Sequence, residues 1–266
     1  MGVITKRVSK SNSAKRILNE LYSNQENILV VHYSCESFYN IKDGRTPRIT
    51  SIAFRYLNSG QTESFSIHKV AEKTGVAFDQ ITENYDSLEK SMLKEYFKFL
   101  QEHKSFKFIH WNMRNVNYGF QAIEHRYEVL GSKPYKIEDS KKFDLARIIQ
   151  SRYSAKYATH PRLPNLMNAN KMSKKNFLLG SEEAEAFDNK EYVKLHQSTL
   201  RKVDVFDDIL KRSAEGLLKT NSNWNDIYGI SPQGIFELTK ENWIAGVAYA
   251  LLWVIVGIIL RNYLII

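Results

Sequence analysis

Three side chains that could take part in chemistry follow the most apolar run in the N-terminal part of the chain. Ser34, Cys35 and Glu36 come after Ile28-Leu29-Val30-Val31 and the pair His32-Tyr33. A short apolar run of this kind is typical of a strand that is buried on both faces. Because alternate residues of a strand share a face, we expect Ser34 and Glu36 to point the same way. The pattern predicts a polar site at the end of a central strand.

Two later stretches carry groups that could join this site. The run from His110 to Asn115 follows another apolar stretch, and Asp204 lies in a long amphipathic segment. Carboxylates such as Glu36 and Asp204 are ligands that Mg²⁺ and Mn²⁺ prefer. His196 is a candidate general base, although on a helix it would lie about 12 Å along the axis from Asp204.

Several alternatives stay open at this point. Asp207 and Asp208 follow Asp204 within about one helical turn, so they either supply further ligands or form a solvated acidic face. His110 either acts with Glu36 or is a hydrogen-bonded structural histidine. Cys35 is expected to face away from Glu36, and we interpret it as a buried, inert thiol rather than a nucleophile.

The elements that must position these groups can be predicted from hydrophobic periodicity. The expected strands are three consecutive ones, then a fourth after a helix, then a short fifth, and helices dominate the chain from residue 143 onward. The expected strands cover residues 27–33, 48–57, 63–68, 106–110 and 135–137, and the last long helix covers 196–219. This order predicts an α/β fold with a mixed five-stranded sheet and flanking helices.

The order of elements and the local motifs resemble the DEDD 3′–5′ exonuclease family on the ribonuclease H-like fold. Ser34-Cys35-Glu36 stands where the family has Asp-x-Glu, and His110-Trp-Asn-Met-Arg-Asn115 stands where it has its second acidic motif. Phe143-Asp-Leu-Ala-Arg147 resembles the segment after the fifth strand, and Asp204 matches the acid on the last long helix. The resemblance covers residues 27–219 and implies a two-metal nuclease site.

The sequence departs from this family at half of its acidic positions. Ser34 and Asn115 replace acids, while Glu36 and Asp204 are retained. The family's base, in its histidine branch, would align with Thr199. Because neutral oxygens are weaker ligands than carboxylates, the resemblance implies poor binding of Mg²⁺ or Mn²⁺ and a degenerate site.

The charge of the chain favours an anionic partner. The formal net charge is +9, from 38 Lys and Arg against 29 Asp and Glu. Basic residues recur beside the expected groove, and such residues contact phosphates with little dependence on sequence. The candidate nucleic-acid-binding residues are Lys174, Lys175, Arg201 and Lys202. The alternative is scattered surface charge, and the sequence does not distinguish DNA from RNA.

The C-terminal segment predicts a membrane anchor. Residues 243–260 carry no charged side chain, and 18 helical residues span about 27 Å, close to the thickness of a hydrocarbon core. The alternative is a buried core helix.

The N-terminus lacks the apolar run of a signal peptide, and the chain has a single cysteine. We therefore expect a domain over 1–219, a connector over 220–241 and a single-pass tail anchor over 242–266, with the domain in the cytoplasm.

The functional expectation is a membrane-anchored, nucleic-acid-binding protein whose exonuclease-like domain has weak or no catalysis. A first alternative is an active metal-dependent nuclease with a rearranged site that uses Glu36, Asp204 and His196. A second is a membrane sensor or interaction module with a protein partner. A role in anti-phage defence is a further hypothesis that rests on the membrane-tethered, nuclease-like design.

Overall fold

The computed structural model describes residues 3–37, 46–229, 235–236, 239 and 243–264. Its centre is one five-stranded sheet in the order β3-β2-β1-β4-β5. β2 runs antiparallel to both of its neighbours, β1 and β3, whereas β1, β4 and β5 are parallel. The strands are β1 (Ile28–Cys35), β2 (Ile49–Tyr56), β3 (Thr62–Ser66), β4 (Lys107–His110) and β5 (Lys142–Asp144).

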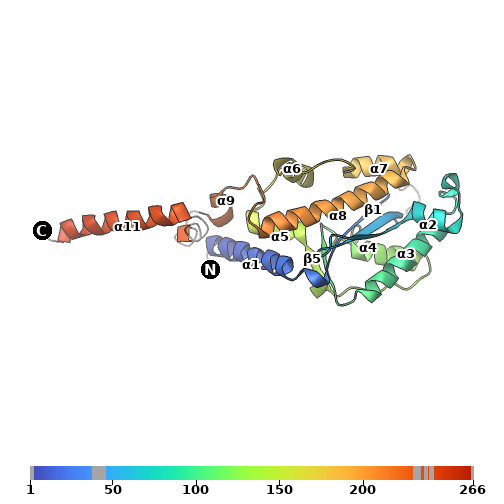
Figure 1. Cartoon of the computed structure of the whole chain (residues 1–266), viewed down its shortest axis with the longest axis horizontal. Coiled ribbons are helices and arrows are strands. Elements are labelled where there is room, and N and C mark those ends of the chain that lie inside the picture. Colours follow the sequence, from blue (N-terminus) through green and yellow to red (C-terminus); the bar gives the residue numbers. More distant parts are fainter. Residues whose placement is uncertain (1–2, 38–45, 230–234, 237–238, 240–242, 265–266) are drawn as a thin grey trace.

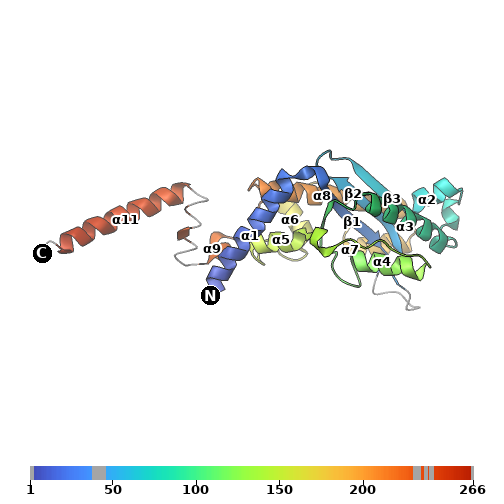
Figure 2. The same ribbon diagram turned by 90° about the horizontal axis from the view of Figure 1, so that it is seen from below.

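Helices cover both faces of the sheet, so alternate residues of β1 enter different cores (Figures 1 and 2). Leu29, Val31 and Tyr33 pack with α2 (Ile67–Thr74), α3 (Tyr85–Glu102) and α4 (Phe120–Val129). Ile28 and Val30 face the opposite core. That core contains α1 (Val3–Ser23), α5 (Leu145–Tyr153), α6 (Arg162–Ala169) and α8 (Tyr192–Ala214). Burial on both faces explains the continuous apolar run of β1.

The α/β fold with a mixed five-stranded sheet is confirmed, and four of the five strands lie close to their expected positions. The fifth strand was expected at 135–137, and this is wrong: β5 is Lys142–Asp144. This strand is at the edge of the sheet, has three residues and carries Phe143 as its one apolar side chain. It is too short to produce the alternation that identifies a strand in a sequence.

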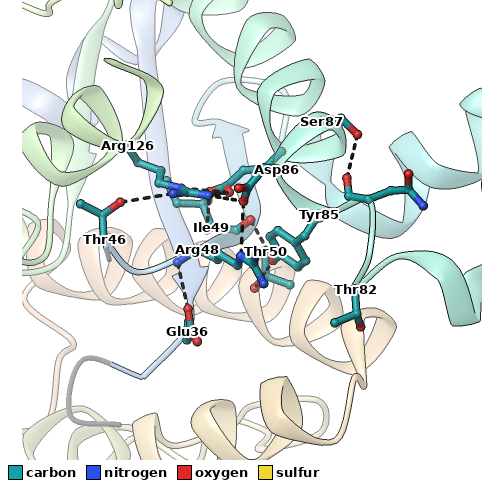
Figure 3. A network of polar contacts seen from close by, with 12 residues as sticks. Glu36, Thr46, Arg48, Ile49, Thr50, Thr82, Tyr85, Asp86, Ser87 and Arg126 are labelled. Atoms are coloured by element: carbon teal, nitrogen blue, oxygen red, sulfur yellow. Dashed lines mark hydrogen bonds and ion pairs between the residues drawn. The ribbon is translucent and has the colours of Figure 1, made fainter. Parts of the chain in front are cut away.

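A buried ion pair ties the start of β2 to two helices on one face of the sheet (Figure 3). The Arg126 guanidinium donates to Glu89 Oε2 over 2.6 and 3.0 Å, and Glu89 Oε1 accepts from the Ile49 amide over 2.7 Å. Asp86 accepts from Arg126 over 2.7 Å. Burial raises the pKa of the Glu89 carboxyl, and the charge and hydrogen bonds of Arg126 oppose that shift. These contacts fix the chain on which Glu36 rests, because the Arg48 amide donates to Glu36 Oε2 over 3.3 Å.

Two further helices lie in the part of the chain where we expected a connector and an anchor. Within 220–241, α9 (Trp224–Tyr228) packs against the domain, and Arg152 donates to the buried Tyr228 hydroxyl over 2.8 Å. Most of the predicted anchor forms α11 (Trp243–Leu264), whereas residues 242, 265 and 266 lie outside the described part. Among the residues that the structure describes, no helix combines the length and the hydropathy needed to cross a membrane.

Candidate functional site

The end of β1 is closed by a chain of hydroxyl groups. Ser34 is fully buried, and its Oγ lies 3.0 Å from Ser51 Oγ on β2. Ser51 Oγ in turn lies 2.6 Å from Thr199 Oγ1 on α8, and Thr199 donates to the Leu195 carbonyl over 3.0 Å. Ser34 and Thr199 are the positions where the resembled family would have an acid and a base. Here they form one buried hydrogen-bonded chain that joins the strand to the helix.

Glu36 lies just beyond this hydroxyl chain. Its backbone continues the pairing with β2, since its amide donates to the Arg48 carbonyl over 2.9 Å. Cys35 packs against the core on the opposite side of the sheet, as expected for a neighbouring residue in a strand. Burial raises the pKa of the Cys35 thiol. A protonated thiol in this position is a poor nucleophile, in agreement with the interpretation of Cys35 as inert.

A buried ion pair stands at the centre of the site. Lys202 Nζ on α8 lies 2.6 Å from Glu183 Oε1 on α7 (Gly180–Asp188), and both side chains are largely buried. The same carboxylate oxygen accepts from Ser198 Oγ over 2.9 Å. His32 on β1 is also buried here, with its ring 5.5 Å from that of Phe206. Burial and the charge of Lys202 hold the pKa of His32 well below its usual value.

Asp204 does not join this group. Its carboxylate lies 3.1 Å from Arg55 Nη1, and Arg55 pairs with Val30 in the sheet, whereas Ser34 pairs with Ser51. Arg55 lies four positions after Ser51, which is about 13 Å along β2. Burial raises the pKa of Asp204, and Arg55 opposes that shift. Asp204 therefore belongs to an ion-pair group near the other end of the sheet.

The candidates for replacement ligands are held in ion pairs of their own. Asp207 Oδ2 accepts from Arg55 Nε over 2.6 Å, and Asp208 Oδ1 accepts from Arg212 Nε over 2.9 Å. Both carboxylates are on α8, in the turn after Asp204, whereas Arg55 is on β2 and Arg212 is on α8. The structure therefore places these carboxylates with arginines, and not with Glu36.

The histidines that we considered as bases lie in separate surroundings. His196 Nε2 is 3.0 Å from Ser64 Oγ on β3, and its ring is 5.1 Å from that of His68. Burial, with Lys69 and His68 nearby, lowers the pKa of His196 to about 3. His110 accepts from the Met113 amide over 3.1 Å, and burial lowers its pKa to about 3. His110 thus makes the hydrogen bond expected of a structural histidine, which was one of the two alternatives for this residue.

The loop after β4 is organised by Asp144 at the end of β5. Asp144 Oδ1 accepts from the amides of Ala146 and Asn112 over 3.1 Å each, so it caps α5 and holds the loop. Its other oxygen forms a close ion pair with Arg114. Asn115 is exposed and caps its own turn, with Oδ1 accepting from the Asn117 amide over 3.0 Å. The carboxylate of this region is therefore used to position Arg114.

Two cavities meet at Lys202. The first, which we name the acidic cavity, measures ≈ 860 Å³ and contains the end of β1 and one side of α7. The second, the basic cavity, measures ≈ 640 Å³ and lies between the loop after β4, the starts of α5 and α6, and the chain before α7. Both are lined by Gly180, Ser181 and Lys202. The acidic cavity has Glu36, Glu183, Glu185 and Asp188; the basic cavity has Arg114, Arg147, His160, Arg162 and Lys202.

The lining of the basic cavity suits an anion. No carboxylate is among its lining residues in the described part of the chain. Arg162 lies 5.5 Å from the centre of the Tyr157 ring, which is buried beneath it. Guanidinium groups bind phosphate oxygens in a two-point geometry.

The four predicted nucleic-acid-binding residues are placed in different ways. Lys202 lines both cavities, whereas Lys174 and Lys175 are exposed on the chain before α7. Arg201 donates to the Ser173 carbonyl over 2.8 and 3.2 Å, which fixes the same chain segment. Sequence reasoning did not select Arg114 or Arg147 for this role. The available signal was that Arg114 lies a few residues after the expected strand 106–110, and that Arg147 ends the Phe143–Arg147 stretch.

The side chains at the end of β1 do not form a donor set for a divalent metal. Glu36 is the one acid of the four family positions at this end, Ser34 is bound to Ser51, and the cation of Lys202 lies nearby. Among the described residues, no three His, Cys, Asp or Glu side chains are grouped so that they could hold a metal ion. Mg²⁺ and Mn²⁺ prefer several anionic oxygens, and these residues do not fit that requirement.

Comparison with known proteins identified no relative of this chain. Neither the protein-family models nor the curated proteins include a match to this chain.

Proposed function

We propose that this protein binds nucleic acid through the basic cavity and does not cleave it. The observation that carries the proposal is the concentration of Arg114, Arg147, His160, Arg162 and Lys202 around a cavity that no carboxylate of the described residues lines. The position of the cavity supports it as well, because ligands of open α/β sheets bind outside the carboxyl ends of parallel strands. Here those strands are β1, β4 and β5.

The strand order β3-β2-β1-β4-β5 supports a ribonuclease H-like assignment for the domain. Within such a domain, the proposed loss of catalysis has three supports. The hydroxyl chain of Ser34 takes the place of a metal ligand, Asp204 is held by Arg55, and Lys202 lines the same cavity as Glu36 with a positive charge that Glu183 holds in place. Relationship to the DEDD exonucleases is part of the same proposal.

Binding is tested by fluorescence anisotropy with labelled 15-nucleotide DNA and RNA strands and duplexes, from 50 to 300 mM salt. The double variant Arg147→Gln/Arg162→Gln should bind roughly tenfold more weakly, and its salt slope for single strands should fall by about 1.4 for two lost phosphate contacts. The matched control, Lys90→Gln/Lys94→Gln, changes the net charge equally on exposed positions of α3. Equal affinity of the two variants would contradict the proposal.

Catalysis is tested on the same strands with Mg²⁺ or Mn²⁺ added. We expect intact strands after prolonged incubation of the wild-type protein. Metal-dependent cleavage that disappears in Glu36→Gln would establish the active-nuclease alternative instead. A protein that binds none of these nucleic acids at low salt would favour the protein-partner alternative.

We also propose that α11 attaches the protein to a membrane by its apolar side chains. The support is the exposure of these side chains around the helix: Leu251, Leu252, Trp253, Val254 and Ile255 are each more than half exposed. Large exposed apolar surfaces of this kind are normally covered by lipid or by another protein. The test is fractionation of cells that express the full chain: recovery in the soluble fraction without detergent would contradict attachment.

A further inference from the structure

Three basic residues form a cluster at the start of α1. Lys6, Arg7 and Lys10 are exposed, while Val8 and Ser11 face the core. Residues three and four apart are neighbours on a helix surface, so Lys10 lies next to both Lys6 and Arg7. From Val3 to Asn19 the helix contains five basic residues and no acidic one. We name the surface of Lys6, Arg7 and Lys10 the α1 basic face.

The position of these charges on the helix is unfavourable in the isolated domain. The N-terminal end of a helix carries a partial positive charge, which favours anions and disfavours cations. The first turn of α1 has no acidic residue that would offset it. The carboxylate of Asp226 on α9 interacts with Arg7, but it is already paired with Lys156 over 2.9 Å. An external anion near Lys6, Arg7 and Lys10 would therefore reduce the repulsion among these cations and the helix end.

The location of the α1 basic face indicates which kind of anion it would bind. In both views, the start of α1 and the start of α11 lie at the same end of the globular domain (Figures 1 and 2). The exposed side chains of α11 are apolar all round the helix, from Val247 to Leu260. A helix without a polar stripe suits lipid better than one protein surface. Basic residues near a membrane are attracted to anionic headgroups within about one Debye length, which is roughly 8 Å in physiological salt.

We propose that the α1 basic face contacts the anionic headgroups of the membrane that α11 enters. This inference rests on the membrane attachment proposed above. Attachment at one end of the domain would leave the basic cavity, which is built from other elements, available to nucleic acid. The α1 basic face is thereby separated in function from Arg114, Arg147 and Arg162.

The test measures flotation of the full chain with phosphatidylcholine vesicles and with vesicles that also contain phosphatidylserine. To isolate the contribution of α1, it uses a chain in which Leu251→Gln, Ile255→Gln and Ile258→Gln weaken the apolar surface of α11 without adding charge. In this background, Lys6→Gln/Arg7→Gln/Lys10→Gln should lower partition to the anionic vesicles by about a hundredfold, because each cation contributes roughly fivefold.

The matched control is Lys90→Gln/Lys94→Gln/Lys133→Gln, which removes the same charge from exposed positions on and after α3. The control should partition like the background chain, and 500 mM salt should remove the difference between the two sets. Equal partition of the two sets at low salt would overturn the inference. So would a loss of oligonucleotide affinity, rather than vesicle affinity, in the α1 set, because the face would then serve nucleic acid.

Failure of the attachment proposal gives a different result. In that case, the chain with unaltered α11 would not float with pure phosphatidylcholine vesicles. The charge-dependent binding of the α1 basic face is measured separately, on anionic vesicles and with α11 weakened. The two outcomes are therefore distinguishable.

Discussion

Lys202 is the central residue of the candidate site, because it lines both cavities and its ammonium group is buried in an ion pair with Glu183. Removing one partner of such a pair leaves the other charged and buried. Lys202→Ala should therefore lower the free energy of unfolding by about 3–5 kcal/mol, as measured by urea denaturation. The double variant Lys202→Met/Glu183→Gln should be clearly more stable than Lys202→Ala. A small effect of Lys202→Ala would mean that the pair is solvated.

The pairing of Lys202 with Glu183 is also an example of a contact that could not be predicted from the sequence. Lys202 was selected as part of a basic cluster with Arg201, and Glu183 belongs to a different helix. Nothing in the spacing of these residues indicates that α7 and α8 bring them within 2.6 Å. Similarly, Asp204 fits a family motif in sequence, but Arg55 from β2 is its partner in space. Such pairings depend on how helices pack on the sheet.

His196 predicts a loss of stability in acid. The unfolded histidine titrates near pH 6.5, whereas burial lowers its folded pKa to about 3. Between these values the unfolded state binds a proton that the folded state does not, so stability falls as the pH falls from about 6.5 to 3. At pH 5 this one group should cost roughly 2 kcal/mol relative to neutral pH. His68, which contacts its ring, has a pKa that burial also lowers, and Lys69 is the nearby cation.

The measurement compares urea midpoints at pH 7 and pH 5 for wild type, His196→Gln and His125→Gln. His125 is exposed on α4 and serves as the control. The drop between the two pH values should be smaller in His196→Gln than in the other two proteins. An unchanged drop would show that His196 does not contribute to the acid sensitivity.

At the scale of elements, the N-cap residues of two helices should differ in how much they contribute to stability. Asp144 caps α5 through the Ala146 and Arg147 amides, whereas Ser66 at the start of α2 makes no capping bond. Asp144→Ala should cost about 1–2 kcal/mol of unfolding free energy. The Ser66 hydroxyl is buried without a hydrogen-bond partner in the described structure, so Ser66→Ala should be neutral or stabilising. Thermal unfolding of both variants tests the contrast; an equal loss would contradict it.

The same elements show how far periodicity can predict the fold. The apolar run of β1 and the alternation in β2 and β3 are strong signals, and these strands were placed within about two residues, as is usual for element boundaries. β5 has three residues with similar partial burial, so it has no inward and outward alternation. Its assignment needs β4 beside it, since Phe108, Ile109 and His110 pair with its three residues. Short edge strands are defined by their neighbours rather than by their own sequence.

At the scale of the whole molecule, the position of Asp204 determines what new acids at positions 34 and 115 can achieve. In Ser34→Asp/Asn115→Asp, the chain would have an acid at each of the four positions of the resembled family. However, Asp204 is held by Arg55, about 13 Å along β2 from Ser51, and Lys202 remains in the same cavity as Glu36. Because a two-metal site needs carboxylates that converge, we expect this variant to show no Mn²⁺-dependent cleavage of labelled strands.

The control for this prediction must separate a missing metal site from a misfolded domain, because Ser34 is buried and an aspartate there is costly. Near-UV circular dichroism and oligonucleotide anisotropy report on the fold and on the basic cavity independently of cleavage. If the variant retains both signals and stays inactive, the packing of α8 on the sheet is what prevents the carboxylates from forming a metal site. Metal-dependent cleavage by the same variant would show instead that α8 can bring Asp204 to the end of β1, and that two acids at positions 34 and 115 are sufficient for a metal site.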